Sequence, residues 1–291
     1  MKRFFSCIWV SGSSPKDQIK VKSKIPNAGI YDEPSIRIMR KISTASMSSD
    51  TTVFHTIDHI DAVTNFMQKA LECFRIKILD DAMLGTRRTF NIIMISSAFM
   101  HDVCHPAGNL DKRSVIEQIA STCLDIIGDT MHRKSLEIQS YIEHTLTDVK
   151  TTKLEALHAL VGVHYASGAI TFTTYQKQFM MCMILATDLN SYHDIANMDT
   201  VMPTTKDIGK ILMRCSDLSH FTMQWKDHLS WVKRLCKELC IDISPGNQVE
   251  FIDTYVLPQF KMLHCFLRCQ ESLDWISCIE SNRSIWESMK V

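Results

Sequence analysis

The residues best suited to chemistry lie in the stretch FMHDVCHPAGN, residues 99–109, which contains His101, Asp102 and His105. They follow FNIIMISSAF, a run of ten residues without charge that begins at Phe90. Imidazole and carboxylate groups are costly to bury unless a partner compensates them, and a metal ion is a common partner for such a pair. We therefore interpret the apolar run as a buried helix that carries His101 and Asp102 to an interior metal site.

Two adjacent residues cannot fill a coordination sphere, so further ligands must come from elsewhere in the chain. His55 and His59 are four residues apart in FHTIDHIDAV, which places them on one face of a helix. Asp217 follows the apolar residues KILM, again at the end of a buried helical run. Each of these residues alone has an ordinary structural explanation. Together, in this order on apolar helices, they favour a shared metal site.

The elements that must position these residues are helices almost throughout. Apolar residues recur at spacings of three and four in residues 53–74, 114–127, 177–189 and 227–240. Only VHYASGAITFTTY, residues 163–175, has any β character, and its Gly168 can mark a turn. We predict an all-α, compact multi-helix domain over residues 53–291. Residues 1–52 are rich in Ser, Lys and Pro and predict a flexible or loosely ordered leader.

Composition narrows the class of protein. Lys plus Arg and Asp plus Glu each number 32, so no net field steers the chain to nucleic acid or to an anionic membrane. The eleven cysteines lack paired CxxC spacing, which indicates free thiols in a reducing compartment. No apolar run approaches the ~20 residues of a membrane span, and no cleavage site closes the short N-terminal apolar run. We expect a cytoplasmic protein without a membrane span; no oligomeric state is predicted.

With these motifs in order, the chain resembles the catalytic domain of the class I 3′,5′-cyclic-nucleotide phosphodiesterases, which belong to the HD-type metal phosphohydrolases. FHTIDHIDAV resembles the family's Tyr-His-Asn-x-x-His-Ala segment, and SSAFMHDVCHPAGN resembles its Ala-x-x-His-Asp-x-x-His-Pro-Gly segment. ILATDL and MRCSDLSH are similar to its Ala-Thr-Asp and Ala-Asp-Leu-Ser motifs. NQVEFIDTYVLPQF resembles its purine-binding region, and ESNRSIW its closing helix. The six motifs cover residues 53–291.

The resemblance implies hydrolysis of cAMP, cGMP or both to the 5′-monophosphate by a hydroxide that two metal ions activate. It implies a first metal, Zn²⁺, with Asp102 also bridging to a second, Mg²⁺ or Mn²⁺. The residues matching the ligands of the first metal are His59, His101, Asp102 and Asp217. His55 matches the general acid that protonates the leaving 3′ oxygen.

Further roles follow from the same resemblance. His105 and Asp188 match positions that hold metal-bound water, and Gln248 and Phe251 match the glutamine and the aromatic residue that bind the purine of the cyclic nucleotide. The active-site glutamate is Glu117 in SVIEQ or, alternatively, Glu155 in LEALHA; we favour Glu117.

The chain also departs from the family pattern. Cys104 and His220 stand where the family usually has Asp and Asn, and fewer residues precede His55 than usual, so we expect a divergent, N-terminally short member. Two alternatives stay open: another HD-type phosphohydrolase acting on a nucleotide, or an inactive relative that binds cyclic nucleotide. Gln248 and Phe251 argue against the first alternative, and the complete ligand set argues against the second.

Overall fold

The computed structural model describes residues 37–41, 43, 53–74, 84–103, 153–189, 192 and 203–290. Every regular element in these ranges is helical, which confirms the predicted all-α class. The elements are α2 (Ile57–Cys73), α3 (Arg87–Met100), α6 (Lys153–Ala169), α7 (Thr174–Leu185), α8 (Thr205–Asp217), the 3₁₀ turn η3 (Ser219–Thr222), α9 (Trp225–Glu238), α10 (Pro245–Phe251), the π-helical turn η4 (Ile252–Val256), α11 (Leu257–Leu267) and α12 (Gln270–Ser288).

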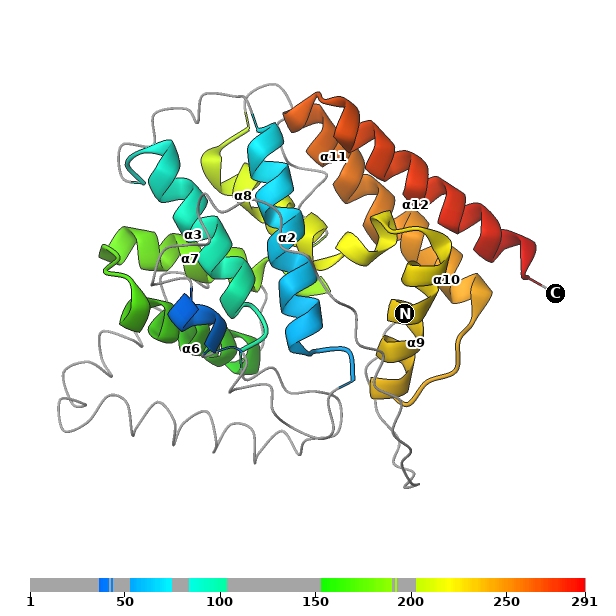
Figure 1. Cartoon of the computed structure of the whole chain (residues 1–291), viewed down its shortest axis with the longest axis horizontal. Coiled ribbons are helices and arrows are strands. Elements are labelled where there is room, and N and C mark those ends of the chain that lie inside the picture. The colour runs from blue at the N-terminus through cyan, green and yellow to red at the C-terminus, as the bar shows by residue number, and fades with distance from the viewer. Residues whose placement is uncertain are drawn as a thin grey trace.

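Helices α2 and α8 lie at the centre of the molecule (Figure 1). On one side, α3 packs against α2 and is itself covered by α6 and α7. On the other side, α11 packs against α8 and against the long C-terminal helix α12. The central position of α2 and α8 matters because each carries a predicted metal ligand near one of its ends.

Side-chain caps fix where several of these helices begin. Thr173 and Thr204 each accept a hydrogen bond from the backbone N–H three residues later, and the residue at that position, Gln176 or Asp207, bonds back to the capping backbone. Both α7 and α8 therefore start with a complete capping box. Ser244 caps α10, and Pro245 occupies the first helical position, where its missing N–H costs nothing.

The stretch with weak β character forms the end of one helix, a short non-helical connection and the start of the next helix. Helix α6 continues to Ala169, past Gly168, and α7 begins at Thr174, so only residues 170–173 lie between the two helices. The apolar residues of this stretch are used in helix packing: Val163 and Ala166 are buried on α6, and Phe172 is buried in the turn.

Part of the predicted leader is ordered against the core. Residues 37–41 and 43 are helical, and Met39 is fully buried. The Ser43 hydroxyl donates a hydrogen bond to the carbonyl of Phe99 at 2.8 Å, near the end of α3. The other residues of 1–52 lie outside the described residues, so the boundary at residue 53 stays a prediction.

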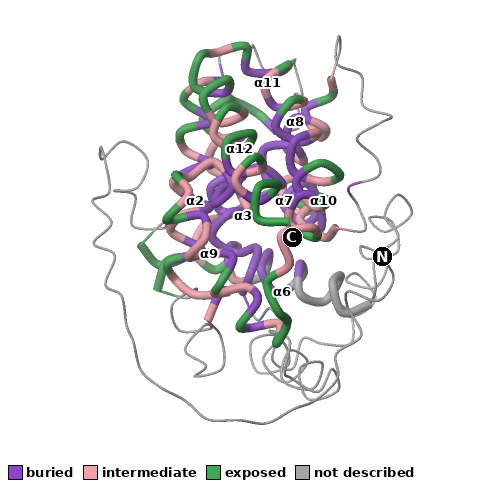
Figure 2. The backbone as a smooth tube through the Cα atoms, turned by 90° about the vertical axis from the view of Figure 1, so that its right-hand side faces the viewer, coloured by how far each residue is buried: buried purple, intermediate pink, exposed green. Residues whose placement is uncertain are grey.

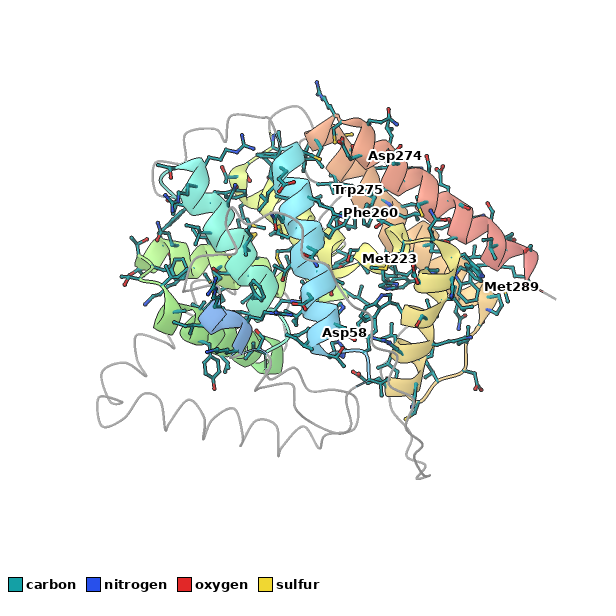
Figure 3. All side chains as sticks on the ribbon, in the orientation of Figure 1. Asp58, Met223, Phe260, Asp274, Trp275 and Met289 are labelled. Carbon is teal, nitrogen blue, oxygen red and sulfur yellow. The ribbon has the colours of Figure 1, made fainter. Side chains whose placement is uncertain are left out.

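The core is continuous from α3 to α12. Buried residues follow the inward faces of the helices in Figure 2. Trp275 of α12 reaches toward α2, where its ring lies 4.5 Å from that of Phe66, and Phe260 of α11 contacts the same ring at 5.8 Å (Figure 3). Among the described helices, none is both long enough and apolar enough to cross a membrane.

Candidate metal centre

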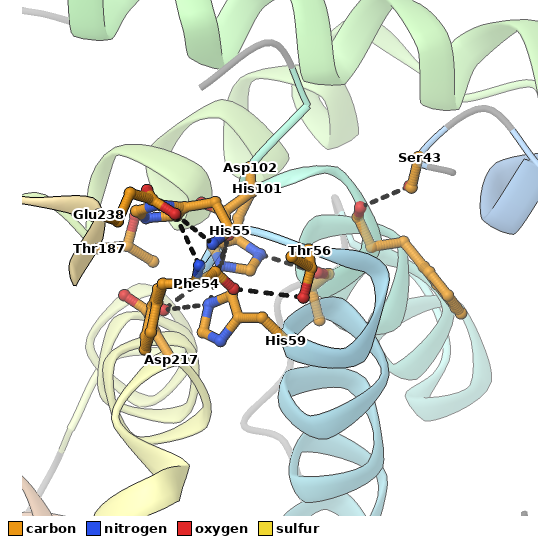
Figure 4. Close-up of polar contacts among 12 residues, drawn as sticks. Ser43, Phe54, His55, Thr56, His59, His101, Asp102, Thr187, Asp217 and Glu238 are labelled. Atoms are coloured by element: carbon orange, nitrogen blue, oxygen red, sulfur yellow. Dashed lines mark hydrogen bonds and ion pairs between the residues drawn. The ribbon is translucent and has the colours of Figure 1, made fainter. Parts of the chain in front are cut away.

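Four of the predicted ligands converge at one buried point (Figure 4). Nε2 of His59 lies 3.3 Å from Oδ2 of Asp102 and 3.1 Å from Oδ1 of Asp217. Nε2 of His101 lies 3.2 and 3.4 Å from the same two oxygen atoms. Imidazole nitrogens and carboxylate oxygens thus alternate around a small ring. Two ligand atoms ~2.1 Å from one ion lie ~3.0 Å apart at a right angle and ~3.4 Å apart at the tetrahedral angle, which is the spacing of neighbouring atoms in this ring. The ligand atoms of His59, His101 and Asp102 all lie within 4.8 Å of one another, and Asp217 contacts both imidazoles from outside that group of three.

The tautomer of His101 also suits a metal ligand. Its Nδ1–H donates to the carbonyl of Ala98 at 2.9 Å, one turn earlier on α3, so in the neutral ring the lone pair is on Nε2. That Nε2 atom is fully buried and makes no hydrogen bond of acceptable geometry among the described residues. A buried acceptor that faces two carboxylates needs a cation between them.

The position of both carboxylates at helix ends makes a cation between them still more favourable. Asp102 lies just beyond the C-terminal end of α3, and Asp217 is the last residue of α8. The C-terminal end of a helix carries partial negative charge, so a carboxylate there is unfavourable unless a cation compensates it. Two such ends meet here, with Asp102 only 5% exposed.

Protonated imidazole supplies positive charge when no metal does. Burial opposes a charge on His101, but the carboxylates of Asp102 and Asp217 outweigh it and raise the pKa of His101 to about 9. Burial likewise opposes the ionised form of Asp217, yet its contacts with the imidazoles of His101 and His59 hold the pKa of that carboxyl well below its usual range. A metal ion would replace the proton of His101, because a ligand imidazole must be neutral. The donor set therefore fits a divalent cation that accepts nitrogen and oxygen ligands, such as Zn²⁺.

His55 lies beside this ring, and a carboxylate holds its other side. Its Nδ1 hydrogen-bonds to Oε1 of Glu238, the last residue of α9. The second oxygen, Oε2, accepts hydrogen bonds from the backbone N–H groups of Val53, Phe54 and His55 at 2.8, 2.6 and 3.1 Å. Glu238 thus fixes both the ring of His55 and the backbone that precedes α2.

The charges of His55 and Glu238 support each other. Burial opposes a charge on His55, but Asp102, Glu238 and Asp217 outweigh it and raise the pKa of His55 above 6.5. Burial also opposes ionisation of Glu238, yet the hydrogen bond from His55 and those from the backbone lower the pKa of Glu238 to about 2. The pairing with Glu238 therefore favours the protonated form of His55, which is the form that a proton donor needs.

Sequence reasoning missed Glu238. It ends the amphipathic helix α9, whose residues suggested ordinary packing, and it is separated from His55 by 183 residues. One local signal was present: an acidic residue in the last turn of a helix is electrostatically unfavourable, and such exceptions tend to mark functional positions.

A second residue missed from the sequence is Arg214, one turn before Asp217 on α8 and fully buried. Its Nε donates to the carbonyl of Ala186 at 3.0 Å, and its guanidinium lies 4.9 Å from the centre of the Tyr192 ring. Arg214 therefore ties α8 to the Ala-Thr-Asp turn after α7. This contact places Asp188, a predicted holder of metal-bound water, on a turn fixed to the Asp217 helix.

The two predicted purine-binding residues lie on a different element. Gln248 and Phe251 are on α10, and both are half-buried. The Phe251 ring stacks on Phe221 of η3, with centroids 5.7 Å apart and planes at 28°. Phe221 contacts His220 at 4.2 Å, and His220 is 6.0 Å from the ring of Phe54, beside the metal ligands. A continuous series of rings thus connects Phe251 to the His–Asp cluster.

The remaining site residues predicted from the sequence are not covered. His105, Glu117 and the side chain of Glu155 lie outside the described residues, so their roles stay predictions.

The structure thus gathers His55, His59, His101, Asp102 and Asp217 at one place, with Glu238 behind them. Comparisons with models of known protein families and with curated proteins found no match for this chain.

Proposed function

We propose that the protein is a metal-dependent 3′,5′-cyclic-nucleotide phosphodiesterase. The observation that carries the proposal is the ring of two imidazoles and two carboxylates next to a third imidazole, His55, that is held by Glu238. A cation site adjacent to a proton donor is what cleavage of a phosphodiester requires: the charge of the phosphate must be neutralised and the leaving oxygen must be protonated. The six ordered motifs that resemble the phosphodiesterase family favour this reaction over other uses of such a site.

The residues of the site would have two roles, metal binding and proton transfer. His59, His101, Asp102 and Asp217 would hold Zn²⁺, and Asp102 would share a second ion, Mg²⁺ or Mn²⁺. The bound ions would lower the pKa of water and offset the phosphate charge. In the reaction, a bond forms between a water oxygen and phosphorus, and the bond from phosphorus to the 3′ oxygen breaks. His55 donates its Nε2 proton to that departing oxygen while Glu238 stabilises the charged ring.

The purine is proposed to bind at α10. The amide of Gln248 can both donate and accept, so it can pair with the edge of either adenine or guanine. Phe251 would stack on the base, an interaction worth about 1–3 kcal/mol. Selectivity between cAMP and cGMP then depends on the orientation of the amide.

The direct test measures hydrolysis of cAMP, of cGMP and of bis(p-nitrophenyl) phosphate by the purified chain, with and without a chelator. We expect chelator-sensitive turnover of at least one cyclic nucleotide. Turnover of the base-free diester alone would support a different HD-type hydrolase, and binding of cyclic nucleotide without hydrolysis would support an inactive relative.

Metal content provides a second test. Asp217→Asn keeps the shape of the side chain but removes a ligand charge, so we expect it to lower bound zinc and abolish turnover. Asp274→Asn is the matched control, because Asp274 is exposed on α12 (Figure 3). Elemental analysis of both variants checks this, and wild-type zinc with full activity in Asp217→Asn would remove the assignment.

A further inference from the structure

A second group of metal-ligand side chains lies at the opposite end of α2 from the His–Asp cluster. Cys73 is the last residue of α2, Cys269 is the residue just before α12, and Glu271 lies in the first turn of α12. One ligand atom from each of the three residues lies within 4.8 Å of the other two. The upper end of α2 adjoins the turn between α11 and α12 in Figure 1.

We propose that Cys73, Cys269 and Glu271 bind a soft divalent cation, Zn²⁺ or Cd²⁺, at a site separate from the His–Asp cluster. Two thiolates and a carboxylate match the preference of these ions for sulfur with one harder ligand, and water completes a tetrahedron. Cys73 and Cys269 are partly exposed and Glu271 is exposed, so an ion can enter from solvent.

The spacing requires little rearrangement. Two sulfur atoms ~2.3 Å from zinc at the tetrahedral angle lie ~3.8 Å apart, and a sulfur and an oxygen ligand lie ~3.5 Å apart. The three ligand atoms already lie within 4.8 Å of one another, so closure onto an ion needs rotation of side chains and no movement of helices.

The surroundings of Cys269 orient it for this role. The Ser272 hydroxyl donates to the backbone carbonyl of Cys269 at 2.7 Å and accepts from Nδ1–H of His264 at 2.7 Å. The Cys269 thiol in turn points at the Ser272 oxygen, 3.5 Å away. Hydrogen bonds that fix a ligand in this way accompany most metal sites.

Two neighbouring thiols can instead form a disulfide, but the raised pKa of the Cys73 thiol disfavours this reaction. Burial raises the pKa of the Cys73 thiol to about 12, with further contributions from the adjacent Cys269 and Glu271. Formation of a disulfide needs a thiolate to attack, and burial makes Cys73 a poor source of one. A bound cation removes this barrier to ionisation, because it replaces the proton.

Binding here would tether α2 to α12. Cys73 is 14 residues beyond His59 on the same helix, a distance of ~21 Å along the axis. The cation would therefore fix one end of the helix whose other end carries a ligand of the His–Asp cluster.

The test is a titration of the reduced, metal-free chain with Cd²⁺, followed by the ultraviolet absorption that thiolate–cadmium bonds produce. None of the four described residues of the His–Asp cluster is a cysteine, and the signal does not depend on catalysis; its loss on removal of Cys73 or Cys269 assigns it to the proposed site. We expect saturable absorption in the wild type and its loss in Cys73→Ser and Cys269→Ser, with cadmium affinity at least ~10–100-fold weaker. Glu271→Gln, an exposed change that leaves both thiols, should weaken affinity while keeping part of the signal.

Cys240→Ser is the matched control, because Cys240 is an exposed free thiol at the end of α9. It should titrate like the wild type. Equal absorption in wild type, Cys73→Ser and Cys269→Ser would overturn the proposal. Absence of the signal in folded wild type, with hydrogen peroxide oxidising Cys73 and Cys269 to a disulfide and itself being reduced to water, would also overturn it and assign a redox role instead.

Discussion

The Glu238→Gln substitution tests the pairing of His55 with its buried carboxylate. The glutamine has the same shape, but it loses the negative charge and exchanges one acceptor oxygen for an NH₂ group. That group must face either the ring N–H of His55 or the three backbone N–H groups that Oε2 now accepts from. Either orientation places donors against donors in a buried position, which is costly.

The magnitude follows from the pKa of Glu238. Its fall from 4.5 to about 2, with one pKa unit equal to ~1.4 kcal/mol, corresponds to ~3 kcal/mol of stabilisation of the charged form. The pKa of Glu238 is depressed, so the stability that its charge contributes is present above pH 4.5 and is lost as pH falls toward 2. The pKa of His55 is raised, so the stability that its charge contributes is present below pH 6.5 and is lost as pH rises through its folded-state pKa. The wild type should therefore exceed the variant in stability most between about pH 4.5 and 6.5.

Urea unfolding of both proteins at pH 5.5 and at pH 3 measures this. We expect Glu238→Gln to lose about 2–3 kcal/mol at pH 5.5 and less at pH 3. Glu280→Gln, at an exposed position of α12, should change little at either pH. In turnover of a cyclic nucleotide, Glu238→Gln should lose roughly 10²–10⁴-fold in kcat with its metals retained. Equal stability of variant and wild type at pH 5.5 would refute the reasoning.

Three further substitutions test the proton donor, the purine site and the packing next to His101. His55→Ala should lose roughly 10²–10⁴-fold in kcat for a cyclic nucleotide but much less for a p-nitrophenyl diester, whose leaving group needs no proton; equal losses would argue that His55 is structural. Gln248→Ala should raise KM for a cyclic nucleotide by an amount equivalent to about 1–3 kcal/mol and leave the base-free diester unchanged; wild-type behaviour on both would remove the purine-binding role. Gly162→Ala should destabilise the fold by about 1–3 kcal/mol in urea unfolding, because its Cβ would lie 2.8 Å from the carbonyl oxygen of Met100, next to His101. Gly168→Ala on the same helix, with nothing within 4 Å of its Cβ, is the control and should be neutral or stabilising.

The parts of the fold that sequence could predict are those that depend on local pattern. The spacing of apolar residues located α2, α7 and α9, and the uncharged run from Phe90 located α3. The connection at residues 170–173 was harder to predict, because its β-branched and aromatic residues favour strands locally. Only the burial of Phe172 and of Val163 against other helices shows that this stretch joins two helices.

Contacts between distant segments explain what sequence could not predict at the site. The side-chain types and order of the four residues in the His–Asp cluster could be read directly, because His and Asp are among the few side chains that bind metal ions, whatever surrounds them. The close approach of Gly162 to Met100 could not, because a glycine in a helix has no distinguishing neighbour in the sequence. The same holds for Arg214, whose partner Ala186 offers only its backbone carbonyl.

A buried carboxylate at the C-terminal end of a helix can mark a candidate site, but its burial cannot always be predicted from the sequence. An acidic residue in the last turn is common where it is exposed: Glu72 lies in the last turn of α2 and Glu287 in the last turn of α12, and both are exposed, so water screens their unfavourable interaction with the helix end. Asp102 differs because the uncharged run from Phe90 to Phe99 precedes it, so its burial can be inferred from sequence; Asp217 follows the shorter apolar run Ile211–Met213 and is half-buried. Glu238 follows the amphipathic residues KRLCK, which predict a half-exposed helix end, and it is buried only because the residues around His55 cover it. A functional acid that owes its burial to a distant segment is therefore recognisable only once that segment has been placed.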